Sequence, residues 1–265
     1  MRSFQNLMDL SGRRALVTGG AGHIGLAVVE CLLELGATVG LIDRDPAMCE
    51  QLARELSNKG SVVAFPCDLS NETEIRAVVR RAIGELGGLE IVVHSAAYVG
   101  TTAIPGWAVA FDEQQVEPFE AAMRVNVTSI LVIAQEAKEA LVKSGNGSVI
   151  CIASIYGLVG PDMRLYEGTA MGNPAGYGAS KGALLSLTRY LATTLAPSVR
   201  VNALSPGGVW RGQPEAFLAR YMQKTPMGRM AIEEDLKGAV GFLASDLSRY
   251  VTGHNLVVDG GWTVW

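Results

Sequence analysis

Tyrosine and lysine stand four residues apart in the stretch Tyr177-Gly-Ala-Ser-Lys181. On a helix these side chains lie one turn apart on the same face, so the lysine ammonium can stand beside the tyrosine phenol. A phenol ordinarily loses its proton at about pH 10, and a neighbouring cation lowers its pKa. The pair therefore predicts proton transfer to or from an oxygen atom near neutral pH. The spacing alone is common, and a solvated surface pair is the plain alternative.

The composition indicates a single globular domain spanning residues 1–265. Of the 265 residues 49% are hydrophobic, which is enough for a substantial core. The net charge of −4 gives no basic surface for nucleic acid or for an anionic membrane. We therefore expect a small-molecule partner. We also expect a cytoplasmic protein, because no segment has the features of a signal peptide or of a membrane span.

Four cysteines lie far apart in the chain, at Cys31, Cys49, Cys67 and Cys151. They show no Cys-x-x-Cys spacing and have no neighbouring histidine, so neither a zinc site nor a disulfide framework is indicated. We expect buried free thiols and no metal.

Short apolar runs alternate with helix-like segments along the whole chain. Predicted strands cover 14–18, 38–43, 62–66, 89–94, 148–153, 200–204 and 255–258. Predicted helices cover 25–35, 47–58, 72–85, 118–143, 177–195 and 232–244. This βαβ rhythm predicts an α/β fold with a doubly wound parallel sheet of about seven strands and helices on both faces. The loops 100–117 and 157–176 are longer than most connections, which favours a functional role for them.

The turn after the first strand carries glycines at Gly19, Gly22 and Gly25. Glycines between a strand and a helix let the backbone turn tightly and approach a pyrophosphate, which the helix amides then bind. We infer a dinucleotide site here that includes His23 and Ile24. An ordinary strand-to-helix turn is the alternative.

Acidic residues end the second and third strands. Asp43 can accept hydrogen bonds from the adenosine ribose hydroxyls, and its charge would repel the extra phosphate of NADP, so it favours NAD. Arg44 beside it could stack on adenine or pair with a phosphate, which leaves NADP as the less favoured cofactor. Asp68, followed by Leu69, could meet the adenine amino group or could cap the helix that begins near Glu72.

These motifs, in this order, resemble the short-chain dehydrogenase/reductase family over essentially the whole chain. The matching segments are 18–25, Asp43, 67–69, 94–97, Asn126, Ser154, Tyr177 with Lys181, 205–207 and 258–261. The resemblance implies a Rossmann-like fold, a nicotinamide cofactor and a catalytic tetrad of Asn126, Ser154, Tyr177 and Lys181. It also implies cofactor contacts from Ser95, Ala96, Pro206, Gly207 and Val209, and a mobile substrate lid at 210–227.

The resemblance assigns a role to each tetrad member. Tyr177 exchanges the hydroxyl proton, Ser154 orients the substrate oxygen, Lys181 binds the ribose and lowers the tyrosine pKa, and Asn126 holds a water that links Lys181 to solvent. Two motifs depart from the family pattern, through His23 in the glycine turn and His94 in place of an asparagine. For both histidines we expect packing or a satisfied hydrogen bond, not catalysis.

The segment between Ser154 and Tyr177 is wider than in most compact members and carries Arg164 and Glu167. Together with the tail 252–265 it resembles bacterial oxidoreductases of flagellin-glycan and legionaminic-type sugar synthesis, which implies a polar sugar-derived or polyol substrate. Arg164 and Glu167 could bind such a substrate, or could form a loop salt bridge.

Three functions remain at this stage. The leading one is an NAD-dependent oxidoreductase that interconverts a secondary alcohol and a ketone. The second is an NADP-dependent 3-oxoacyl-thioester reductase, which Asp43 and the lack of a basic docking patch oppose. The third is a non-catalytic nucleotide-binding regulator, which the complete tetrad opposes. The family resemblance also implies a homodimer or homotetramer.

Overall fold

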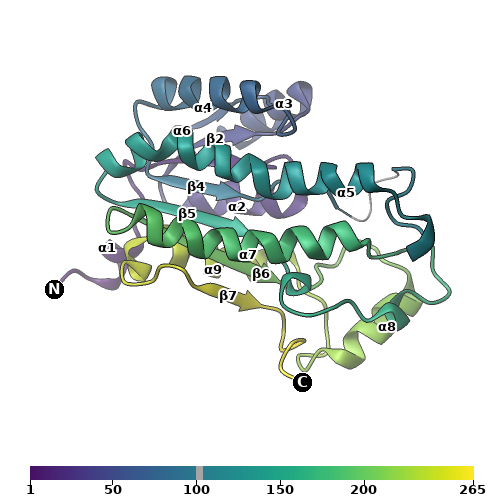
Figure 1. Cartoon of the computed structure of the whole chain (residues 1–265). Coiled ribbons are helices and arrows are strands. Elements are labelled where there is room, and N and C mark those ends of the chain that lie inside the picture. Colours follow the sequence, from purple (N-terminus) through teal and green to yellow (C-terminus); the bar gives the residue numbers. More distant parts are fainter. Residues whose placement is uncertain (100–103) are drawn as a thin grey trace.

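A seven-stranded, all-parallel sheet forms the centre of the molecule (Figure 1). The computed structural model describes residues 1–99 and 104–265. The strand order is β3-β2-β1-β4-β5-β6-β7. Strands β2 and β3 are added on one side of β1 and the next four on its other side, so the topological switch point lies between β1 and β4. The strands are β1 (Arg14–Thr18), β2 (Thr38–Ile42), β3 (Val62–Ala64), β4 (Ile91–His94), β5 (Gly147–Ile152), β6 (Val199–Pro206) and β7 (Asn255–Val258). The predicted doubly wound α/β fold is confirmed.

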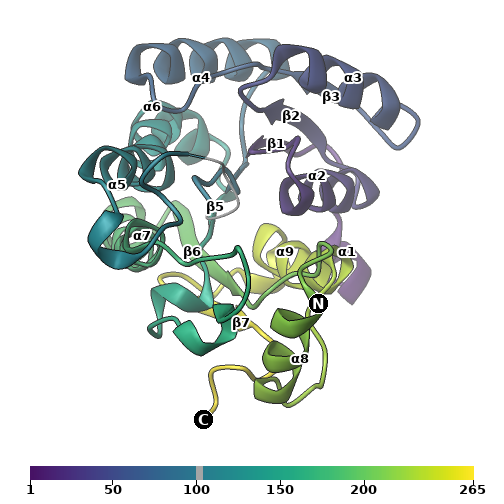
Figure 2. The ribbon, with the colours of Figure 1, turned by 90° about the vertical axis from the view of Figure 1, so that its right-hand side faces the viewer.

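Helices cover both faces of this sheet. Viewed along the strands, α4 (Glu72–Leu86), α6 (Ser129–Lys143) and α7 (Ala175–Leu195) lie on one side, and α2 (His23–Glu34), α3 (Pro46–Leu56) and α9 (Lys237–Ala244) lie on the other (Figure 2). Each layer buries its own apolar cluster against the sheet, with side chains such as Ile133 and Leu184 on the first side and Val28 and Leu243 on the second. Burial of both sheet faces explains why the central strands are nearly continuous apolar runs.

Some predicted helices differ in detail from the observed ones. The segment 118–143 is not one helix, because α5 (Val116–Met123) is separated from α6 by a π-helical turn at Arg124–Thr128. The segment 232–244 begins as a 3-10 turn, Glu233–Leu236, before α9. Among the described residues, two α-helices were not predicted: α1 (Phe4–Met8) and α8 (Glu215–Lys224), which forms part of the expected lid. The loop 100–117 begins at residues outside the described ranges. Within residues 1–99 and 104–265, no helix is long and apolar enough to cross a membrane.

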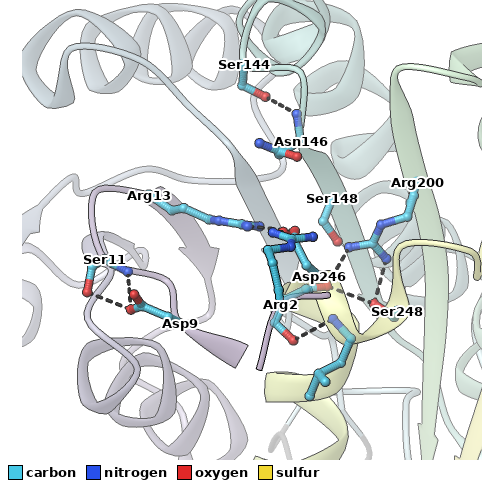
Figure 3. A network of polar contacts seen from close by, with 12 residues as sticks. Arg2, Asp9, Ser11, Arg13, Ser144, Asn146, Ser148, Arg200, Asp246 and Ser248 are labelled. Carbon is cyan, nitrogen blue, oxygen red and sulfur yellow. Dashed lines mark hydrogen bonds and ion pairs between the residues drawn. The ribbon is translucent and has the colours of Figure 1, made fainter. Parts of the chain in front are cut away.

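A network of arginines fastens the edge of the sheet where the chain begins (Figure 3). Asp246 accepts from Arg2 at 2.5 Å and from Arg13 at 2.6 Å, so it holds the N-terminal segment against the turn after α9. Arg200 of β6 donates to Ser248 Oγ at 2.8 Å, and burial lowers its pKa to about 10. The N-terminus lies at the opposite end of the sheet from the strand arrowheads (Figure 1), so this network leaves the carboxyl edge free.

The strand register brings the chemically interesting residues to that carboxyl edge. Thr18 of β1 pairs with His94 of β4, which in turn pairs with Cys151 of β5. Because all strands run in parallel, the glycine turn after Thr18 and the segments after His94 and Ile152 leave the sheet side by side. The sequence predicted these residues one motif at a time, and the register gathers them.

Two glycines allow the turn between β1 and α2 to close. Gly19 has φ +67°, and a Cβ added there would lie 2.6 Å from the Ala96 nitrogen. A Cβ added at Gly25 would lie 1.9 Å from the Gly19 carbonyl oxygen. Side chains are therefore excluded from both positions by their backbone neighbours.

We predict that Gly25→Ala lowers the free energy of unfolding by about 1–3 kcal/mol, because the added methyl group must displace backbone atoms. Gly84→Ala is the matched control, since Gly84 lies inside α4 with nothing within 4 Å of an added Cβ. That control should be neutral or stabilising by up to about 1 kcal/mol. Urea unfolding of both variants measures the difference, and equal midpoints would contradict the close packing.

Candidate active site

Helix α7 places Tyr177 and Lys181 on one face, at the carboxyl end of β5. Lys181 is only 2% exposed, and its Nζ donates to the Ile152 carbonyl at 2.7 Å. The same Nζ lies 5.7 Å from the centre of the Tyr177 ring. The surface-pair alternative is therefore wrong for this pair, because the lysine is enclosed by the fold.

Burial controls the electrostatics of this pair. It lowers the pKa of Lys181 to about 8. It also raises the pKa of Tyr177, although a hydrogen bond with Ser154 and the charge of Arg211 act in the opposite direction. The expected lowering of the Tyr177 pKa by Lys181 is thus wrong for the protein alone. The physical reason is that the ammonium donates to the Ile152 carbonyl and that desolvation of the phenolate is the larger effect.

Ser154 lies in the first turn after β5. It caps the 3-10 turn Ile155–Gly157, where its Oγ accepts from the Tyr156 amide at 3.1 Å. The same hydroxyl hydrogen-bonds to Tyr177. The structure therefore brings Ser154 and Tyr177 together, as the sequence order suggested.

Asn126 lies in the π-helical turn between α5 and α6 and is fully buried. Its Nδ2 donates to Ser180 Oγ at 2.8 Å, and its Oδ1 accepts from the Tyr98 amide at 2.6 Å. Ser180 precedes Lys181 on α7, so Asn126 contacts the helix of the Tyr177–Lys181 pair through this neighbour. A π turn often marks a functional position in a helix.

The glycine turn leaves the start of α2 without a side-chain cap. Gly22 is the N-cap residue and makes no side-chain capping bond, so the first amides of the helix, from His23 and Ile24 onward, point out of its end. Gly19 approaches Ala96, which follows Ser95 after β4. The residues predicted to bind the pyrophosphate and its neighbours therefore lie together.

Asp43 lies beside this turn at the end of β2. Its Oδ2 accepts from the Ala21 amide at 3.1 Å, and its Oδ1 accepts from the Arg44 amide at 2.8 Å. The Arg44 side chain is exposed. The carboxylate is thus oriented by the glycine turn itself.

Asp68 is exposed at the end of the third strand segment and accepts from the Ser70 amide at 2.8 Å. The alternative that Asp68 caps α4 is wrong, because Asn71 Oδ1 accepts from the Glu74 amide at 3.2 Å and fills that role. Leu69 is buried in the core.

The exit from β6 carries the remaining predicted cofactor residues. Pro206 ends the strand, and the Gly207 amide donates to the Val258 carbonyl at 2.9 Å. Val209 is buried, and its carbonyl accepts from Gln213 Nε2 at 2.8 Å. These residues lie at the carboxyl edge next to β5, the strand that Ser154 follows.

The two histidines differ in their surroundings. His94 is fully buried, its Nδ1 lies 2.9 Å from Thr18 Oγ1, and burial lowers its pKa to about 3. It is therefore a neutral brace between β4 and β1, which confirms the packing role. His23 is largely exposed, and its Nδ1 lies 3.6 Å from Glu233. All four cysteines are free and buried, which confirms that prediction too.

An aromatic cluster beside the tetrad was not anticipated from the sequence. It joins Tyr156 and Tyr166 from the segment after β5 to Phe217 and Tyr221 of α8 and to Trp262 of the C-terminal tail. These residues come from three distant segments and share no spacing, so no pattern could reveal them. Arg164 does not point to a ligand: it donates to both carboxylate oxygens of Asp162, as the salt-bridge alternative held.

A nicotinamide dinucleotide fits this edge of the sheet. The glycines let the turn after β1 pack closely against the backbone of Ala96, and the uncapped amides at the start of α2 supply donors for the charge of a pyrophosphate. Asp43 supplies an acceptor for ribose hydroxyls next to the same turn. Lys181 supplies an ammonium with three donors, of which the Ile152 carbonyl accepts from one.

Comparison with known proteins agrees with this geometry. A family model described as enoyl-(acyl carrier protein) reductase matches residues 19–263. The 4-formylbenzenesulfonate dehydrogenase of Comamonas testosteroni is 36% identical, with 96% of this chain and 99% of that protein covered. The rhamnolipid-biosynthesis 3-oxoacyl-[acyl-carrier-protein] reductase of Pseudomonas aeruginosa is 35% identical, with 96% and 97% covered.

Solved structures show the same architecture. A short-chain type dehydrogenase/reductase from Mycobacterium marinum superposes with a TM-score of 0.86 at 33% identity, covering 99% of each chain. A gluconate 5-dehydrogenase from Burkholderia cenocepacia, solved with NADP and tartrate, gives 0.86 at 28% identity, covering 99% of this chain and 100% of that one. With the matched model, these relatives show that the chain belongs to the short-chain dehydrogenase/reductase family of NAD(P)-dependent oxidoreductases that act on CH–OH groups.

Proposed function

We propose that the protein is an NAD-dependent oxidoreductase that interconverts a secondary alcohol and a ketone on a polar, sugar-derived or polyol substrate. The observation that carries this proposal is the half-buried Tyr177, hydrogen-bonded to Ser154 and placed one helical turn from the buried Lys181. A phenol in such a site is a proton donor and acceptor for a substrate oxygen that reaches Ser154 and Tyr177 together. The regulator alternative gains no support, because all four tetrad residues lie at one edge.

In this proposal the chain's own residues manage the proton and the oxygen. Tyr177 takes the hydroxyl proton in the oxidation and returns it in the reduction. Ser154 donates to the substrate oxygen and fixes its position against the phenol. Lys181 holds the ribose and places a positive charge near the phenol, while Asn126 steadies α7 through Ser180. The nicotinamide, when bound, accepts or supplies the hydride at the carbinol carbon.

Two considerations bear on the cofactor. The Asp43 carboxylate beside the glycine turn supports NAD, since it would repel a 2′-phosphate. The exposed Arg44 next to it is the group that could offset this repulsion. The Burkholderia cenocepacia gluconate 5-dehydrogenase was solved with NADP, so a relative of the same fold binds the phosphorylated cofactor.

The substrate class follows from the groups around the tetrad. Hydroxyl and amide side chains of the segment 157–176 lie next to the aromatic cluster, and this mixture of polar and aromatic surface suits a hydroxylated ring or chain. The 3-oxoacyl-thioester reductase is a second candidate, favoured by the similarity to the Pseudomonas aeruginosa reductase. A panel of polyols, sugars and acyl thioesters separates the two. As an assembly we propose a homodimer or homotetramer, and as a location the cytoplasm.

Replacing Tyr177 with phenylalanine should lower kcat by about 10²–10⁴-fold, because the variant loses its proton donor and acceptor. Binding of NAD, measured by titration, should change by less than about twofold, since the ring remains in place. Tyr190→Phe on the same helix is the control, because Tyr190 is 61% exposed and its loss should leave turnover intact. A Tyr177→Phe enzyme with full activity would remove the basis of the proposal.

Replacing Asp43 with asparagine should make NADP a better cofactor by about tenfold or more in kcat/KM, because the amide keeps the acceptor for Ala21 but removes the negative charge. The measurement is the NAD-to-NADP ratio of kcat/KM for the wild type and the variant. Asp68→Asn is the control and should leave the ratio unchanged. A wild-type preference for NADP would show that Arg44 outweighs Asp43.

The two reaction directions should respond differently to pH between about pH 6 and about pH 7, where Lys181, with a pKa of about 8, stays mostly charged. Burial raises the pKa of Tyr177, so the phenol is protonated at the start of this range. Oxidation needs the phenolate, and its kcat should rise with pH. Reduction needs the phenol, and its kcat should hold or fall. Oxidation that slows as pH rises would rule out Tyr177 as the base.

A further inference from the structure

The segment after Ser154 contains a chain of hydrogen bonds that the proposed proton transfer does not use. Asn173 Nδ2 donates to Tyr166 Oη at 3.2 Å, and Tyr166 Oη lies 3.0 Å from Tyr156 Oη. Tyr156 stands two residues after Ser154, in the turn that Ser154 caps. This chain of hydrogen bonds thus begins at Asn173 in the segment 157–176, called the inserted segment below, and ends next to Ser154.

The two phenols of this hydrogen-bond chain have one more hydroxyl hydrogen than the bond between them needs. The two phenols carry two hydroxyl hydrogens, and the single bond between them uses one. Tyr166 already accepts from Asn173, so it donates onward to Tyr156 most favourably, because bonds that run in one direction polarise each other. The remaining hydrogen therefore belongs to Tyr156. Among the residues that the structure describes, no acceptor for it is found.

The position of Tyr156 makes this hydrogen available to a ligand. Tyr166 is 9% exposed, whereas Tyr156 is only partly buried. Tyr156 is also close enough to Tyr177 for the two phenols to interact electrostatically, and burial together with its tyrosine neighbours raises the pKa of Tyr156. Tyr156 is therefore a neutral donor at the side of the proposed proton-transfer site.

The side-chain amide of Asn173, which donates to Tyr166, leaves its own oxygen without a hydrogen bond. Its Oδ1 is buried and, within the described ranges, has no hydrogen-bond partner. Leaving a buried acceptor unpaired costs about 1–3 kcal/mol. The amide nevertheless presents its Nδ2 to Tyr166 Oη, which accepts from it and leaves its own hydrogen for Tyr156 Oη at 3.0 Å.

The inserted segment is also held firmly against the helix α8. Arg220 donates to the Leu165 and Glu167 carbonyls, at 3.3 Å and 2.5 Å, and Lys224 pairs with Asp162. Figure 2 shows this segment beside α8 and near the C-terminus, at the carboxyl edge of the sheet. Tyr166 packs on Phe217 of α8 with ring centres 5.3 Å apart. The phenols therefore sit on a wall built from three parts of the chain.

Three cationic side chains of this wall have acceptors within it. Arg220 donates hydrogen bonds to backbone carbonyls, and Lys224 and Arg164 both form ion pairs with Asp162. Arg211, which acts on Tyr177, lies 3.7 Å from Glu233, which offsets its charge. The phenols of this wall can donate to an uncharged hydroxyl oxygen of a ligand.

We propose that Tyr156, oriented by Tyr166 and Asn173, is a specificity-determining residue that donates a hydrogen bond to a second oxygen of the substrate, a hydroxyl group away from the carbon that is oxidised. The substrate class is an uncharged polyol or sugar. This inference rests on the proposed function and deepens it, because Ser154 and Tyr177 bind the reacting oxygen and Tyr156 binds another.

The test compares pairs of substrates in the wild type and in Tyr156→Phe. Each pair is a polyol or sugar that the wild type oxidises and its analogue lacking one hydroxyl group away from the reacting carbon. Tyr156→Phe should lower kcat/KM for the hydroxylated member by about tenfold, mainly through KM, and that for the deoxy member by less than about twofold. Tyr250→Phe, at a fully exposed position, is the matched control.

Tyr166→Phe provides a second variant that acts without touching the substrate. It removes the hydroxyl that orients Tyr156, so it should lower the same discrimination by a smaller factor than Tyr156→Phe does. If either variant slows both members of every pair equally, its role is structural and the inference is overturned. A wild type that prefers deoxy substrates or hydroxy acids would overturn it as well. A wild type that turns over no alcohol or ketone would instead refute the proposed function itself.

Discussion

The burial of one ammonium group organises this protein. Lys181 is enclosed against the end of β5, where its Nζ is held by the Ile152 carbonyl, and its pKa falls to about 8 because the fold removes it from water. An ammonium has three N–H donors, and the Ile152 carbonyl is the one acceptor found for them among the described residues. Because a buried lysine with unused donors is costly, the other two donors favour a ligand at this position. The length of α7, its contact with Asn126 through Ser180 and the turn at Ser154 all serve to hold this group beside Tyr177.

The electrostatic consequence is that the protein alone keeps Tyr177 protonated. Burial raises the pKa of Tyr177, and the hydrogen bond with Ser154 offsets only part of that effect. A positively charged group bound next to Tyr177 would favour the phenolate. Binding of an oxidised cofactor would therefore prepare the phenol as a base in the direction of alcohol oxidation, and a reduced cofactor would leave it as an acid.

The two edges of the sheet have different tasks. At the amino edge, Asp246 ties Arg2 and Arg13 to the turn after α9, and the bonds there are all between parts of the chain (Figure 3). At the carboxyl edge, the start of α2 has no side-chain cap, so its first amides lack side-chain partners among the described residues. In open α/β sheets ligands bind at the carboxyl ends of the strands, which is the edge where the start of α2 lies.

The sequence alone determined the alternation of strands and helices and the position of the glycine turn, because these depend on local periodicity and on short motifs. The four proposed tetrad positions came from the family resemblance. The sequence did not determine the π turn that interrupts the segment 118–143, since five residues are too few for the apolar pattern to distinguish a π turn from an α turn. Nor did it reveal the wall of Tyr156, Tyr166 and Trp262, whose members meet only when α8 and the tail fold over the edge. The direction of the Tyr177 pKa was likewise decided by tertiary structure, because desolvation depends on everything that surrounds the phenol and not on the lysine four residues away.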